Sequence, residues 1–198
     1  QEAFDCGVFN LNWNLSLAKR LSLEEIRNAS KNKDIETFRA WYPQEITRSW
    51  QNSVLICQRS NAVWARRQNS LYAIFLALMT LVMAAAGMAL CLHRGEMLSI
   101  YLVAVFLPSL PSLLDFLDLA RSHFREAKDR EALEERIDGQ LSNSLAVSAE
   151  SLRQNQDGIF LLRSKAPLVP GWFYKRLASG VEKDMRFASD QLSRRIED

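Results

Sequence analysis

The stretch LYAIFLALMTLVMAAAGMALCL, residues 71–92, contains no charged side chain. As an α-helix it would be about 33 Å long, because each residue adds about 1.5 Å. The hydrocarbon core of a membrane needs about 20 residues, and a core helix of a soluble protein is rarely apolar on every side over such a length. The stretch therefore predicts a transmembrane helix.

A second uncharged stretch, MLSIYLVAVFLPSLPSLL at residues 97–114, follows after the short polar sequence HRGE. Two antiparallel helices joined by so short a turn would form a transmembrane hairpin. Neither stretch has the two-residue alternation of a membrane β-barrel strand, and a bilayer otherwise permits only helices. The alternative is a helical hairpin buried in a larger soluble assembly, which would be soluble without detergent.

Basic residues flank the hairpin on both outer sides, whereas its turn carries only Arg94, offset by Glu96. The flanking residues are Arg59, Arg66 and Arg67 before the first span and Arg121, Arg125, Lys128 and Arg130 after the second. Because basic residues accumulate on the cytoplasmic side, both flanks are expected in the cytoplasm. The sequence thus predicts an all-α membrane protein with a cytoplasmic helical segment (1–70), a transmembrane hairpin (71–120) and a cytoplasmic helical tail (121–198).

The flanks carry their own helix signals. Ser22 followed three residues later by Glu25 is typical of a capping box at a helix start. Pro43 should interrupt a helix, and near-helical spacing of apolar residues predicts a helix from about residue 44 into the first span. Further helices are expected from the second span to about residue 141 and from 172 to 196. The aromatic and Asn-rich segment 4–14 is interpreted as irregular or as a short strand.

Composition excludes several classes of protein. The chain has 198 residues, with 25 Lys and Arg against 23 Asp and Glu and a net charge of +2, so no DNA or RNA partner is expected. Its three cysteines are far apart, which argues against a structural zinc site and a disulfide framework. Without a catalytic motif or a phosphate-binding glycine loop, we expect no enzyme activity, no cofactor and no metal.

Two pairs of residues at the second span are candidates for function. Asp115 and Asp118 share one helix face and could form an acidic, cation-favouring pore mouth in a ring of subunits. Alternatively, they lie at the lipid–water boundary and merely end the span. Pro108 and Pro111 remove helical hydrogen bonds and could form a gating hinge, or only a static kink.

Small residues in the first span predict a surface for close helix packing. The candidates for this surface are Ala84, Ala85 and Gly87.

Several segments occur in an order that resembles the SMODS-associated four-transmembrane effectors of bacterial conflict systems. They are FDCGVFNLNWN (4–14), WYP (41–43), LICQRSNAVW (55–64), the hairpin, and QDGIFLLRSKAPLVPGWFYKRL (156–177). The resemblance implies a pore-forming homo-oligomer in the bacterial inner membrane, made beside a cyclic-oligonucleotide synthase in CBASS-type antiviral defence and causing abortive infection. Members carry two further spans upstream, so we expect this sequence to be the C-terminal two-thirds of such a protein. The alternative is a membrane-anchored scaffold or sensor without a pore.

The same resemblance implies a nucleotide signal, and one cluster offers the right chemistry for it. Cations can hold phosphates while an aromatic ring stacks on a base. The candidate nucleotide contacts are Arg163, Lys165, Trp172, Tyr174 and Arg176, which could form a cytoplasmic pocket with Arg39, Trp41, Tyr42 and Arg59. The alternative is a packed cytoplasmic core with interfacial aromatic residues.

Overall fold

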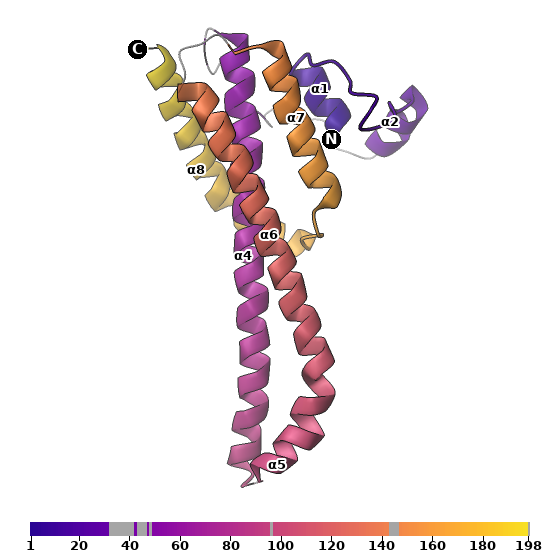
Figure 1. Ribbon diagram of the computed structural model, residues 1–198, viewed down its shortest axis with the longest axis vertical. Coiled ribbons are helices and arrows are strands. Elements are labelled where there is room, and N and C mark those ends of the chain that lie inside the picture. The colour runs from indigo at the N-terminus through magenta and orange to yellow at the C-terminus, as the bar shows by residue number, and fades with distance from the viewer. Residues whose placement is uncertain (32–41, 43–46, 48, 96, 143–146, 198) are drawn as a thin grey trace. The chain divides into compact units, whose positions relative to one another are not determined.

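The computed structural model describes the chain apart from residues 32–41, 43–46, 48, 96, 143–146 and 198 (Figure 1). Its helices are α1 (Glu2–Val8), α2 (Leu23–Ser30), α4 (Trp50–His93), α5 (Leu98–Ile100), the π-helix η1 (Tyr101–Phe106), α6 (Leu107–Ser142), α7 (Ala149–Lys165) and α8 (Gly171–Glu197). The described residues contain no strand. The predicted all-α membrane fold class is therefore confirmed.

Local signals explain several helix ends. The capping box predicted at α2 is present, because the Ser22 hydroxyl accepts from the Glu25 N–H and the Glu25 carboxylate accepts from the Ser22 N–H. The interpretation of residues 4–14 as irregular or strand was wrong for residues 4–8, which belong to α1, whereas residues 9–14 are irregular. Asn10 then adopts a φ of 48°, a left-handed conformation that asparagine tolerates better than most residues.

The chain forms two compact units. The first unit comprises Gln1–Trp64, Arg130–Lys165 and Ala178–Asp198. The second unit comprises Ala65–Asp129 and Ala166–Leu177. The predicted membrane limits of 71 and 120 fall within the second unit and stay a prediction.

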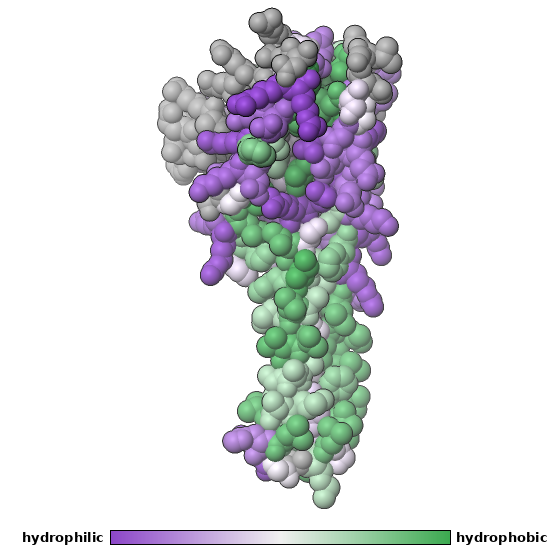
Figure 2. All heavy atoms as spheres, turned by 90° about the vertical axis from the view of Figure 1, so that its left-hand side faces the viewer, coloured by the Kyte–Doolittle hydropathy of each residue, from purple (hydrophilic) through white to green (hydrophobic). Residues whose placement is uncertain are grey.

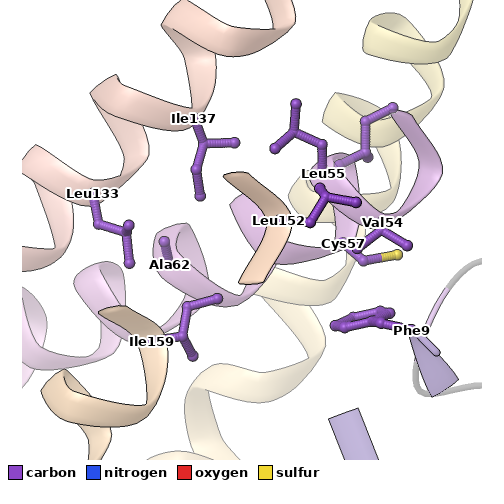
Figure 3. Packing of buried hydrophobic residues seen from close by; sticks show 10 residues of the cluster. Phe9, Val54, Leu55, Cys57, Ala62, Leu133, Ile137, Leu152 and Ile159 are labelled. Atoms are coloured by element: carbon purple, nitrogen blue, oxygen red, sulfur yellow. The ribbon is translucent and has the colours of Figure 1, made fainter. Parts of the chain in front are cut away.

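A hydrophobic core holds the first unit together. Side chains from α4, α6 and α7 point toward one another there, and Phe9 completes the cluster (Figure 3). Leu55, Ile137 and Leu152 are completely buried. Each such side chain contributes about 1.5–3 kcal/mol on burial, so this core is a main source of the unit's stability.

The core of the first unit also contains buried amides. Gln58 of α4 is fully buried, and its Nε2 donates to the backbone oxygen of Leu152 in α7 at 2.8 Å. Asn155 is equally buried, and its Nδ2 donates to Gln140 Oε1 at 2.7 Å. Directional bonds of this kind fix how α7 lies against its neighbours.

The second unit is a helical hairpin in which the membrane half of α4 runs antiparallel to η1 and the first part of α6 (Figure 1). α4 and the continuous helical stretch Leu98–Ser142 are both long and apolar enough to cross a membrane. In the most apolar window of each, only 17% and 11% of the residues are buried. Apolar side chains consequently cover the hairpin surface (Figure 2), as expected for a surface that faces lipid.

After the short helix α5, the second membrane helix continues over Tyr101–Phe106 as a π-helix rather than an α-helix. At its end the Leu107 N–H bonds to the oxygen of Leu102, five residues back. Pro108 follows directly and Pro111 lies inside α6, and neither proline can donate a backbone hydrogen bond. Pro108 cannot donate to the oxygen of Ala104, four residues back, and Ala104 lies within the π-helix.

Candidate functional site

The register of the hairpin places Asp115 and Asp118 beside the uncharged run of α4. His123 of α6 meets the Tyr72 ring edge-on with ring centroids 4.8 Å apart, and Tyr72 is the second residue of that run. Asp118 and Asp115 precede His123 in α6 and therefore lie nearer the hairpin turn. Their distances from His123 along the helix axis are roughly 8 Å and 12 Å, at about 1.5 Å per residue. Both carboxylates therefore lie level with the uncharged part of α4 and not at its end.

Both aspartates are exposed on the hairpin surface. Their neighbours Leu114 and Phe116 are 49% and 38% exposed, so the carboxylates project from an otherwise apolar surface. Asp118 forms an ion pair of 3.0 Å with Arg121, one turn nearer the predicted cytoplasmic end. Asp115 is thus the one of the two acidic groups that lies nearer the hairpin turn.

Only part of the predicted packing surface makes the close approach. A Cβ atom added at Gly87 would lie 3.0 Å from Cε2 of Tyr101, whose side chain is buried. The Tyr101 hydroxyl donates to the backbone oxygen of Ala84 at 2.8 Å. Ala85 is exposed. The glycine gives the aromatic ring its place against α4.

The candidate nucleotide contacts fall into both units. Arg163 belongs to the first unit and forms an ion pair of 3.0 Å with the fully buried carboxylate of Asp5. Lys165 is exposed in the same unit. Trp172, Tyr174 and Arg176 belong to the second unit. The charge of Arg163 is therefore already balanced within the protein.

The remaining members of the suggested pocket differ in how far the structure describes them. Arg59 forms ion pairs with Glu134 and Asp138 of α6. Tyr42 packs near Phe9 in the first unit. Arg39 and Trp41 lie outside the described residues.

Asp5 is a central polar residue that sequence reasoning did not single out. It is completely buried and accepts hydrogen bonds from the Tyr42 hydroxyl at 2.9 Å and from Arg163 at 3.0 Å. The Tyr42 oxygen in turn accepts from Asn61 Nδ2 of α4 at 2.7 Å. Burial, assisted by the Asp5 charge, raises the pKa of the Tyr42 phenol. The one signal in the sequence was an aspartate among aromatic and apolar residues at 4–9.

A second set of charged contacts joins α1 to α7. Arg153 of α7 pairs with Glu2 at 2.9 Å and with Asp157 at 2.6 Å. Asn14 Nδ2 also donates to Asp157 at 2.8 Å. The cavity beside these residues has a volume of only about 10 Å³, room for a single water molecule and not for a nucleotide.

Metal binding finds no support in the part of the chain that the structure describes, because no three His, Cys, Asp or Glu side chains there are grouped to hold an ion. What the geometry does offer is a lipid-facing hairpin with carboxylates on its surface and a helical unit held by buried polar contacts. These features define an all-α membrane protein of the hairpin type.

The chain belongs to the family of the SMODS-associating 4TM effector domain, which matches residues 1–192. It is also 28% identical over 180 residues to a probable CBASS effector molecule of Bacillus cereus. That alignment covers 88% of this chain and 61% of the relative, so the chain spans less than two thirds of the relative's length. No solved structure matches the chain.

Proposed function

We propose that this chain is the membrane-permeabilising part of a CBASS antiviral effector, and that its copies assemble in the inner membrane around a water-filled pore. The observation that carries the proposal is the position of Asp115, exposed and level with the uncharged run of α4. Membership of a 4TM effector family and similarity to a probable CBASS effector support the setting.

Asp115 supplies a physical reason for assembly. A charged aspartate on a lipid-facing helix costs up to about 2.5–3.5 kcal/mol at the centre of the span and less toward the ends. Copies that turn this side chain toward a shared water-filled lumen would avoid that cost, because the carboxylate stays hydrated. A ring of carboxylates would then attract cations and repel anions.

Activation by a cyclic oligonucleotide belongs to the same proposal. Basic residues on both outer sides of the hairpin support a cytoplasmic location for the flanks, where such a signal would be available. The candidate nucleotide contacts stay those predicted from the sequence, although Arg163 among them already forms an ion pair with Asp5. Opening of the pore in infected cells would dissipate the ion gradients and cause abortive infection.

Ion selectivity in reconstituted liposomes tests the proposal at Asp115. We expect the activated protein to pass potassium more readily than chloride, and we expect Asp115→Asn to reduce this preference several-fold. Asp129→Asn is a matched control, because Asp129 is an exposed carboxylate of the same helix beyond His123. Equal selectivity in the wild type and both variants would count against a pore lined by Asp115.

The second candidate is a membrane-anchored sensor that passes a signal to a partner without opening a pore. The observation that favours it is α6, which continues as one helix from Leu107 to Ser142 and could transmit a movement along its axis. This function predicts intact membranes in activated cells together with a stoichiometric protein partner.

A further inference from the structure

The connection between α7 and α8, with the first turn of α8, exposes two large apolar side chains. Leu168 is 92% exposed, the highest value among the large apolar side chains of the described residues. Trp172, at the start of α8, is 56% exposed. Such exposure beside a membrane hairpin suggests a partner that is itself apolar.

This connection packs onto the beginning of the first membrane span. The Trp172 ring meets Phe75 edge-on at 5.7 Å, and the neighbouring Phe173 ring lies 4.9 Å from that of Tyr72. Val169 packs against the same cluster. Phe75 lies about 6 Å beyond the start of the uncharged run at Leu71, at about 1.5 Å per residue. The connection is therefore level with the first turns of the span.

The backbone of the connection is suited to hold Leu168 away from the protein. Pro167 and Pro170 stand on either side of Leu168 and Val169 and restrict the backbone conformations of this stretch. The Pro170 oxygen accepts from the N–H groups of Phe173 and Tyr174 at 3.0 and 3.2 Å, which ties the connection to the first turn of α8.

Charge and side-chain type both fit a membrane surface. Tryptophan is enriched where the headgroups meet the acyl chains. Lys175 and Arg176, which follow Trp172 in α8, are exposed. Arg121 and Arg125, on either side of His123 in the same unit, are exposed as well. Cations at this level would attract the headgroups of anionic lipids.

We propose that residues 166–172 form an interfacial membrane anchor. Leu168 enters the acyl region, Trp172 lies among the headgroups, and Lys175 and Arg176 bind anionic lipid. The anchor fixes the start of α8 to the bilayer surface, and α8 then continues into the first unit. This inference goes beyond the proposed pore, because it holds whether or not the hairpin conducts ions.

The test measures how deeply position 168 lies in a membrane. The full chain carries Leu168→Cys and Cys91→Ser, while Cys6 and Cys57 stay buried, so that a spin label attaches at position 168. The protein is placed in liposomes of phosphatidylcholine and phosphatidylglycerol. We expect oxygen, which dissolves in the membrane, to collide with this label more often than a water-soluble nickel chelate does.

The control label is placed by Leu15→Cys, because Leu15 is 75% exposed in the first unit. There we expect the nickel chelate to be the more frequent collider. A label at 168 that behaves like the one at 15 would overturn the proposal, because the connection would lie in water. A label at 168 protected from both reagents would overturn it in favour of a protein partner or a second copy.

The anionic-lipid contact has its own comparison. Pure phosphatidylcholine, or the double variant Lys175→Gln and Arg176→Gln, should move the label at 168 toward the water. A depth that stays the same in both cases would contradict the role given to these two cations.

Discussion

At the scale of single residues, the polar contacts of Asp5 decide how the first unit is held together. Its carboxylate is buried and bonded to Tyr42 and Arg163, which come from separate parts of the chain. The nearby Cys57 thiol is also buried. Burial, with a smaller contribution from the Asp5 charge, raises the pKa of Cys57 from 9.0 to about 12. A thiol in this environment stays protonated and unreactive at neutral pH.

The raised pKa of Cys57 predicts a loss of stability in alkali. Above about pH 9 the thiol ionises in the unfolded chain, whereas the folded protein keeps it protonated until about pH 12. The unfolded state then binds fewer protons, so the free energy of unfolding falls as the pH rises between these values. Its contribution is about 1.4 kcal/mol per pH unit.

Denaturant unfolding of the wild type and of Cys57→Ala, measured from pH 7 to pH 11, isolates this contribution. In Cys57→Ala, the free energy of unfolding should lack the part of its decline above pH 9 that comes from Cys57. The contribution of Tyr42 to the pH dependence is present in both proteins. Parallel profiles above pH 9 would show that Cys57 is accessible to water in the folded state.

At the scale of elements, the hairpin depends on the contact between Gly87 of α4 and Tyr101 of η1. We predict that Gly87→Leu destabilises the hairpin by about 1–3 kcal/mol, because the new side chain meets a buried ring only 3.0 Å from its first atom. Ala85→Leu is the control, since Ala85 is exposed two residues earlier on the same helix. Thermal unfolding in detergent gives the comparison, and equal melting temperatures for the two variants would refute the packing.

The same hairpin shows what the sequence can and cannot predict. Both spans follow from their uncharged runs, and the helix start at Ser22 follows from its capping box. The π-helix and the position of Asp115 relative to α4 cannot be predicted from the sequence in this way. They depend on which residues of the two antiparallel helices face each other. That register is set by tertiary contacts, Tyr101 with Ala84 and Tyr72 with His123.

The network around Asp5 illustrates a second limit. Residues 1–14 carry no pattern that predicts contact with α7, yet Glu2 and Asp5 pair with Arg153 and Arg163. Arginines that stand near aromatic residues in a sequence resemble a nucleotide site, and only the fold shows that Arg163 already has a carboxylate partner. The candidate nucleotide contacts therefore stay a prediction, one of whose members, Arg163, is paired with Asp5.

At the scale of the whole molecule, the chain comprises a hairpin with an apolar surface and a helical unit with a buried polar network. Family membership makes the chain a 4TM effector domain, and the similar Bacillus cereus protein is a probable CBASS effector. The described part of the hairpin exposes few polar groups for a water-filled pore, and Asp115 is its described carboxylate nearest the turn. Assembly of several copies is therefore the central requirement of the proposed function.

The most direct measurement is the membrane potential of bacteria that produce the complete effector together with its nucleotide synthase, followed with a voltage-sensitive dye. We expect depolarisation on activation, before ATP synthesis or DNA is lost, and a smaller or slower depolarisation with Asp115→Asn than with Asp129→Asn. A potential that persists while growth stops would contradict the pore and favour the sensor.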